Sequence, residues 1–323
     1  MKSLPELKDA FTQLIASPSI SALEPEQDMS NHAVIEILQS WFSDMGFECT
    51  VSTVADSRGK QNLVATIGSG KGGLLLAGHT DTVPFDEGRW SQNPFELTEK
   101  DNRWYGLGTC DMKGFFALIM EALKTVPLHE LKRPLHIFAS ADEETTMNGA
   151  KAFADSKSIA PDYAIIGEPT SLKPVYMHKG HLAQGIRVIG RSGHSSDPAR
   201  GLNAIEIMHQ VVGQLMKLKQ HLSENYREDA FSVPHPTMNF GHIHGGDAAN
   251  RICGCCDLHL DIRPLPGIEL ADLELMVINY LSEISKQYPG SIEISTLYPG
   301  SESFAGKVDS YWTKLVVEIS NTE

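Results

Sequence analysis

The sequence lacks the features that define several classes of protein. None of its apolar runs is long enough to span a bilayer. Positive charge is scarce, because 27 lysines and arginines stand against 41 aspartates and glutamates, a formal net charge of −14. Nucleic acids and anionic membranes select basic surfaces. We therefore expect neither of them as a partner.

Cysteine is also scarce. The five cysteines are an odd and scattered set, so we predict no disulfide framework and a reducing compartment. Cys253, Cys255 and Cys256 lie close together, but they lack the paired C-x-x-C spacing of structural zinc sites and lie in a strand-like stretch. The first six residues show no charged segment followed by an apolar one. We therefore expect no signal peptide and a cytoplasmic protein.

The first half of the chain alternates helical and strand patterns. Its 323 residues, 41% hydrophobic and 21% charged, are typical of one large or two modest globular domains. Helical periodicity covers residues 4–16, 31–46 and 115–126, and strand patterns cover residues 48–53, 62–67, 74–79, 135–141 and 163–167. This alternation predicts an α/β domain with a mainly parallel sheet. Residues 68–73 match G-x-G-x-x-G, but they open a strand instead of a helix, so we predict a glycine-rich hairpin turn.

The pattern changes after about residue 180. Strands are expected at 184–189, 237–242, 252–262 and 291–296, and helices at 202–217 and 270–284. The order βαββαβ is that of a ferredoxin-like unit, whose exposed edge could join a second subunit. We therefore predict three segments: a metal-binding catalytic domain (1–180), an inserted dimerisation domain (181–297) and a return to the catalytic domain (298–323), with a helix at 308–320.

Three apolar runs end on side chains that bind metals. The first ends at His79 and is followed by Asp81, the second is followed by Glu143 and Glu144, and the third ends at Glu168. Buried strands of open α/β sheets deliver functional side chains at their carboxyl ends, so these groups should meet at one sheet edge. Asp111 lies just ahead of the helical pattern at 115–126 and is expected at the same edge. Together they form the ligand set of a two-metal hydrolase.

Each of these residues also has a simpler interpretation. A single His-x-Asp is usually a surface or helix-cap pair, and an Asp-Glu-Glu run is usually a solvated cluster of charge. The shared sheet edge favours the metal site over these alternatives. Because Glu143 and Glu144 are adjacent, their side chains point in different directions, so one can bind metal while the other acts as a general base.

Long motifs resemble one family. They are Gly78-His79-Thr80-Asp81-Thr82-Val83-Pro84, Tyr105-Gly106-Leu107-Gly108-Thr109-Cys110-Asp111-Met112-Lys113-Gly114, Asp142-Glu143-Glu144, Gly167-Glu168-Pro169-Thr170, Arg191-Ser192-Gly193-His194-Ser195-Ser196-Asp197 and Gly241-His242-Ile243-His244-Gly245-Gly246-Asp247. These strings resemble those of the M20 metallopeptidase and deacylase family over the whole chain.

The resemblance implies two Zn²⁺ ions per subunit, with Co²⁺ as a possible substitute. His79, Asp111 and Glu168 would hold the first ion, and Asp111 would share the second with Glu144. Asp81 would orient the His79 ring. The substrate would be a small N-acyl amino acid, and the protein would be a homodimer.

The remaining roles implied by the resemblance concern catalysis and substrate binding. Glu143 would be the general base that activates water and later protonates the leaving amine. His194 would reach across the dimer to stabilise the tetrahedral oxyanion, although a solvated loop histidine is the simpler interpretation. Asn250 and Arg263 are weaker candidates for binding substrate. An arginine suits a carboxylate, yet near a strand end it is more often merely exposed.

One departure from the family pattern affects the expected activity. Members normally contribute a last metal-binding histidine from a late Ala-His motif, whereas the last histidine here is His259. The second metal would then keep only Asp111 and Glu144, so we expect either a truncated chain or a defective second site. The implied reaction is hydrolysis of N-acetyl-L-ornithine to L-ornithine and acetate. Another M20 amidohydrolase (a succinyl-diaminopimelate desuccinylase or a dipeptidase) and an inactive form that binds one metal stay open.

Overall fold

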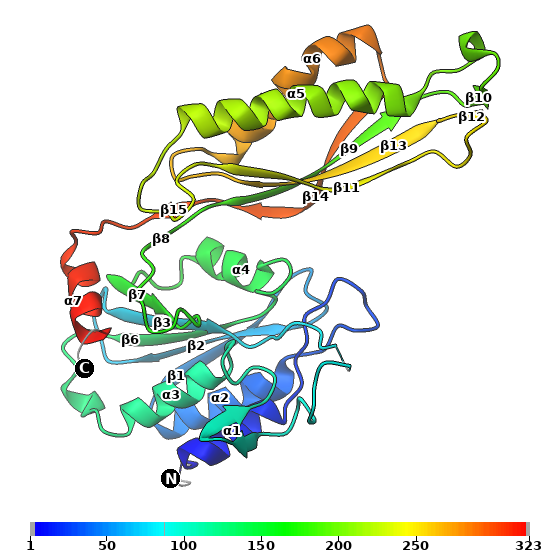
Figure 1. The fold of residues 1–323 in the computed structure, drawn as a ribbon. Coiled ribbons are helices and arrows are strands. Elements are labelled where there is room, and N and C mark those ends of the chain that lie inside the picture. Colours follow the sequence, from blue (N-terminus) through cyan, green and yellow to red (C-terminus); the bar gives the residue numbers. More distant parts are fainter. Residues whose placement is uncertain (1–3, 87, 321–323) are drawn as a thin grey trace. The chain divides into compact units, whose positions relative to one another are not determined.

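The computed structural model describes residues 4–86 and 88–320 and contains two compact units that divide between Leu172 and Lys173 (Figure 1). The three-segment division at 180 and 297 stays a prediction, and residues 321–323 of its last segment lie outside the described residues. Within the described ranges, no helix combines the length and the apolarity needed to cross a membrane.

The first unit is built on a five-stranded sheet. Its strands lie in the order β1 (Glu48–Thr53), β2 (Gln61–Ile67), β6 (Leu135–Ser140), β3 (Leu74–His79) and β7 (Tyr163–Ile166). β2 is antiparallel to both β1 and β6, whereas β3 is parallel to β6 and β7. Only β2 therefore runs against the common direction, and the predicted α/β fold is confirmed.

Three helices cover one face of this sheet: α1 (Leu7–Ile15), α2 (His32–Asp44) and α3 (Gly114–Leu123). Their apolar stripes meet β2 and β6 in one core that includes Phe11, Phe42 and Phe116. α4 (Asn148–Ser156) lies on the other face (Figure 1). Every residue of β6 is buried. Burial on both faces explains why Ile137, Phe138 and Ala139 follow one another without the alternation of a half-exposed strand.

The predicted hairpin at residues 68–73 is wrong. β6 lies between β2 and β3, so the glycine-rich segment passes over the start of β6 and does not join neighbouring strands. A Cβ atom on Gly73, whose φ is +91°, would lie 2.0 Å from the carbonyl oxygen of Pro134, just before β6. Glycine is needed here for this close backbone approach. Local sequence could not reveal a strand that inserts from 60 residues further along the chain.

The second unit is the predicted βαββαβ arrangement. Its antiparallel sheet has the order β11 (Thr237–Gly245), β13 (Cys255–Arg263), β9 (His181–Ile189) and β14 (Ile292–Ser301). β13 alternates buried and less buried residues, as expected for a strand covered on one face. The covering helices are α5 (Ala204–Asn225) and α6 (Leu270–Gln287), which share a core with the sheet.

Short elements complete the described chain. They are the strands β4 (Thr98–Lys100), β5 (Arg103–Tyr105), β8 (Met177–His178), β10 (Gly193–His194), β12 (Arg251–Ile252) and β15 (Phe304–Ala305), the helix α7 (Tyr311–Ser320) and two short 3₁₀ turns, Leu128–Glu130 and Pro198–Arg200. The pairs β4–β5, β8–β15 and β10–β12 are antiparallel.

Candidate metal centre

Four chain segments meet at the carboxyl edge of the first sheet. His79 is the last residue of β3, Glu143 and Glu144 follow β6, and Glu168 follows β7. These three strands are parallel neighbours, so their carboxyl ends lie side by side. Asp111 reaches the same place from the loop before α3. The five side chains therefore lie at one edge of the sheet, as the sequence predicts.

The His79 imidazole is the centre of the cluster. The ring is buried, with only 1% of its surface exposed. Its Nε2 atom lies 3.2 Å from Asp111 Oδ1, 3.7 Å from Glu168 Oε1 and 3.9 Å from Glu143 Oε2. Two groups have ligand atoms within 4.8 Å of one another: His79 with Asp111 and Glu168, and His79 with Glu143 and Glu144. The sharing of Asp111 with Glu144 that the resemblance implies stays a prediction.

Asp81 has a different set of contacts from the simple ring partner that was expected. His79 Nδ1 lies 2.9 Å from the backbone oxygen of Asp81 and 3.5 Å from its carboxylate. The carboxylate, fully buried, accepts hydrogen bonds from the amides of Glu143 at 3.3 Å and Glu144 at 3.1 Å. Asp81 therefore joins the end of β3 to the loop after β6 in addition to facing the ring.

Burial and neighbouring negative charge together shift the pKa values of the cluster. Burial raises the pKa of Glu144 to about 7, and the charges of Asp111 and Glu143 act in the same direction. Burial also raises the pKa of Glu143 and of Glu168, against the effect of His79. Burial opposes protonation of His79, but Asp81 and the neighbouring glutamates outweigh it and raise its pKa to about 10.

The donor set fits a divalent metal ion. A carbonyl oxygen can only accept, so the proton of a neutral His79 lies on Nδ1, and the Nε2 lone pair faces the carboxylates. A lone pair facing carboxylate oxygens is repulsive unless a proton or a cation lies between them. One imidazole nitrogen and several carboxylate oxygens are ligands that zinc accepts.

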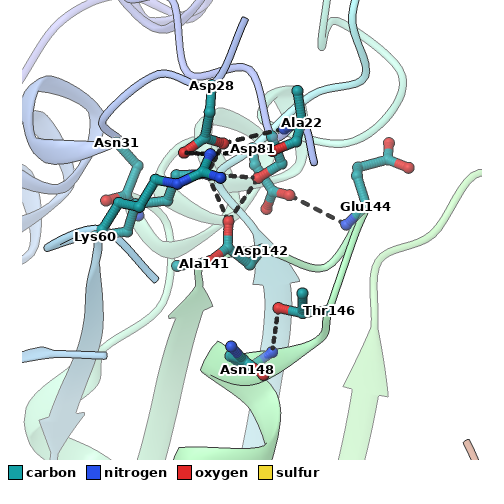
Figure 2. A network of polar contacts seen from close by, with 12 residues as sticks. Ala22, Asp28, Asn31, Lys60, Asp81, Ala141, Asp142, Glu144, Thr146 and Asn148 are labelled. Atoms are coloured by element: carbon teal, nitrogen blue, oxygen red, sulfur yellow. Dashed lines mark hydrogen bonds and ion pairs between the residues drawn. The ribbon is translucent and has the colours of Figure 1, made fainter. Parts of the chain in front are cut away.

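A second polar network lies behind this cluster, and the sequence reasoning missed it. Figure 2 shows Lys60 lying between Asp28 and Asp142, the residue before Glu143. The side chain of Glu144 points away from Asp81, whereas its amide faces the Asp81 carboxylate (Figure 2). The sequence analysis gave roles to Glu143 and Glu144 but none to Asp142. Nothing in the local sequence linked it to Lys60.

The other predicted residues lie in the second unit. His194 is in β10, paired with Arg251 of β12, and the carbonyl of Asn250 accepts a hydrogen bond from the amide of Ser195 at 3.0 Å. His194 and Asn250 are thus brought together. Arg263, at the end of β13, donates two hydrogen bonds to the Asp261 carboxylate, at 2.9 and 3.0 Å. Its guanidinium is therefore already engaged.

The chain belongs to the peptidase family M20/M25/M40, whose family model matches residues 75–321. It is accordingly a metal-dependent amidohydrolase by class.

Two named relatives are similar to the chain in sequence, and two solved structures are similar to it in fold. The chain is 58% identical to an acetylornithine deacetylase of Erwinia tasmaniensis over 92% of this chain and 77% of the relative. It is 54% identical to that of Pectobacterium carotovorum over 99% of this chain and 84% of the relative. Its fold is similar to an M20 metallo-carboxypeptidase of Sulfolobus solfataricus (TM-score 0.76, 17% identity, 99% and 85% coverage) and a tripeptidase of Staphylococcus aureus (0.70, 20%, 97% and 80%).

Proposed function

We propose that this chain hydrolyses N-acetyl-L-ornithine to L-ornithine and acetate with the help of bound zinc. The observation that carries the proposal is the cluster around His79 at the carboxyl edge of the sheet. The choice of substrate rests on relatives 52–58% identical over most of the chain, which are named acetylornithine deacetylases. The reaction would supply ornithine to arginine biosynthesis in the cytoplasm.

The first ligand set coincides with one group of side chains in the cluster, and the second is the one that the family resemblance implies. His79, Asp111 and Glu168 would hold one ion, and Glu144 would share the other with Asp111. When bound, zinc polarises the scissile carbonyl and acidifies a nearby water. The first ion would have three protein ligands, whereas the second would have Glu144 and the shared Asp111, so we expect one ion to bind much more tightly than the other. Metal analysis after dialysis should find about one equivalent, since catalytic zinc sites usually keep three protein ligands.

Glu143 is proposed as the general base. Its side chain is about one-third exposed, and burial raises its pKa, so its carboxylate is a stronger proton acceptor than a solvated one. It would take a proton from the attacking water and deliver it to the nitrogen of the departing ornithine. Attack of the water oxygen would form the new C–O bond and a tetrahedral oxyanion, and the C–N bond would break when this intermediate collapses to acetate and the protonated amine of ornithine.

His194 is proposed to donate a hydrogen bond to the oxyanion in a homodimer. Its Nδ1 accepts from the Ser196 amide at 3.2 Å and lies 2.7 Å from the Ser196 hydroxyl, which can also donate to it. With both donors directed at Nδ1, the ring would carry its proton on Nε2. The Nε2–H group is then the donor that an oxyanion needs. Asn250, next to it, would contact the substrate. Arg263 would have to exchange Asp261 for a substrate carboxylate.

A substrate panel tests the proposal. The zinc-loaded and cobalt-loaded protein is assayed with N-acetyl-L-ornithine, N-succinyl-diaminopimelate and dipeptides, with metal-stripped protein as the control. Preference for N-acetyl-L-ornithine supports the proposal. Preference for the succinylated substrate or for dipeptides would assign another reaction of the family. Absence of turnover with every substrate and both metals would refute catalysis by this chain.

A further inference from the structure

We propose that Lys60 is a positioning residue that holds the Glu143–Glu144 segment in place through Asp142. This inference rests on the proposed function for its catalytic consequence, but its structural part is independent of any substrate. It assigns a role to a buried ion pair that lies outside the metal cluster.

The Lys60 ammonium group is fully satisfied away from water. Its side chain is 2% exposed, and Nζ lies 2.7 Å from Asp28 Oδ1, 2.5 Å from Asp142 Oδ1 and 2.9 Å from Ser21 Oγ. An ammonium has three donors, and each has an acceptor here. Both carboxylates are also buried, with side-chain exposures of 7% for Asp28 and 6% for Asp142. Such a group of charges is costly to bury and strongly favours one geometry.

Ser21 and Arg58 complete the network. The Ser21 hydroxyl donates to Asp142 Oδ1 at 2.8 Å, and Arg58 lies 3.1 Å from the second oxygen of Asp28. Two cations therefore balance two carboxylates. The five residues of the network come from the segments before α2 and before β2 and from the loop after β6. The network thus connects three segments that are far apart in the sequence.

The backbone conformation of Asp142 links the network to the candidate metal centre. Its φ is +57°, in the left-handed region that residues other than glycine adopt rarely and at a cost. In this conformation the side chain of Asp142 binds Lys60, while the next two amides donate to the buried Asp81 carboxylate. The amide of Met147 donates a hydrogen bond to the carbonyl of Asp142 at 2.6 Å, so the segment 142–147 forms a turn.

The carboxylates of this turn therefore have different partners. The Asp142 side chain contacts Lys60 in the network, whereas Glu143 and Glu144 lie in the cluster with His79. Without the Lys60 cation, Asp142 would be a buried carboxylate with only Ser21 as a side-chain partner. Loss of the ion pair between Asp142 and Lys60 would remove a contact that stabilises the backbone conformation of Asp142. A small misplacement of a general base can lower turnover by about 10²-fold.

The experiment compares three variants with one control. Lys60→Met removes the cation at similar length, Asp142→Asn removes its partner charge, and Ser21→Ala removes one hydroxyl without changing any charge. Lys132→Met, at an exposed lysine, is the matched control. Hydrogen exchange is measured for the amides of Glu143, Glu144 and Met147 in metal-free protein, with amides of α5 in the second unit as the internal reference.

We expect exchange in the 143–147 segment to quicken at least about tenfold in Lys60→Met and Asp142→Asn, with α5 unchanged. The effects should not add in the Lys60→Met/Asp142→Asn double variant, because both act through one contact. Ser21→Ala should give a smaller increase, and it keeps the proposal testable if Lys60→Met does not fold. Unchanged exchange of these amides in the folded variants would overturn the proposal.

Kinetics then test the consequence for catalysis. In Lys60→Met that retains its zinc, we expect kcat to fall about tenfold or more while KM changes little, since the segment would misplace a base and leave the binding of substrate intact. Loss of the zinc ion held by His79, Asp111 and Glu168, together with a raised KM, would point to general damage and would contradict a positioning role. Lack of activity in the parent protein would refute the proposed function alone, because the exchange result does not depend on turnover.

Discussion

At the scale of single residues, the sequence predicted those candidate metal ligands that lie at the end of a strand. His79 and Glu168 follow apolar runs, and parallel neighbours carry such residues to one edge whatever the details of packing. Contacts between residues far apart in the sequence could not be predicted from it. Lys60 and Asp142 are 82 residues apart, and Asp81 contacts amides more than 60 residues away. Such contacts depend on how the segments pack and leave no local pattern.

Replacing Glu143 with Gln should separate catalysis from metal binding. The amide keeps the shape of the side chain but cannot accept a proton from water, so kcat should fall by ~10²–10⁴. Zinc content should stay at the level of the parent, because His79, Asp111 and Glu168 are intact. Zinc analysis and steady-state kinetics on one preparation give both values. A variant with near-normal turnover would show that another group activates the water.

Zinc binding should strengthen as the pH rises from 6 to 8. The ligands must lose their protons to bind metal, and the pKa of Glu144 is raised to about 7 and that of His79 to about 10 in the metal-free cluster. Below pH 7 Glu144 holds a proton that competes with zinc, and His79 releases one at either pH. Titration against a chelator, in two buffers of different ionisation enthalpy, measures the affinity and the protons released. Equal affinity at both pH values would contradict this account.

At the scale of elements, the periodic patterns predicted the helices and strands well, and the failure lay in the connection between them. Residues 68–73 have the composition of a hairpin turn, and only the pairing of β2 and β3 with β6 shows that they cross another strand. Strand order depends on pairing between distant segments, which amphipathic patterns do not encode. The second unit was easier, because its βαββαβ order already restricts the sheet to few topologies.

This crossing can be tested with two glycines of the same segment. Gly73→Ala should lower the free energy of unfolding by well over about 1 kcal/mol, because it combines an unfavourable φ with a backbone clash. Gly70→Ala is the matched control: its φ is +104°, but no atom lies within 4 Å of the added Cβ, whereas the Cβ of Gly73→Ala meets the Pro134 oxygen. Urea unfolding of both variants measures the difference. If both variants lose the same free energy of unfolding, the positive φ alone accounts for the loss and the close approach to Pro134 contributes nothing.

At the scale of the whole molecule, the candidate residues come from both units. The candidate metal ligands and Glu143 belong to the first unit, and His194 and Asn250 belong to the second. Their assembly into one site stays a prediction. If His194 serves the partner's cluster, as proposed, each complete site requires residues from two chains. A dimer with the same surface on both subunits would then contain two equivalent sites.

Complementation between two inactive variants tests this arrangement. His194→Ala and Glu143→Gln homodimers should each have little activity. After mixing and subunit exchange, a heterodimer would combine the Glu143 of one chain with the His194 of the other in one intact site. If exchange is random, half of the dimers are mixed and each has one working site, so about a quarter of the parent activity should return. Sedimentation analysis confirms the dimer, and mixing either variant with itself is the control. If His194 acts on its own subunit's cluster, mixing restores nothing, because every chain then carries its own defect.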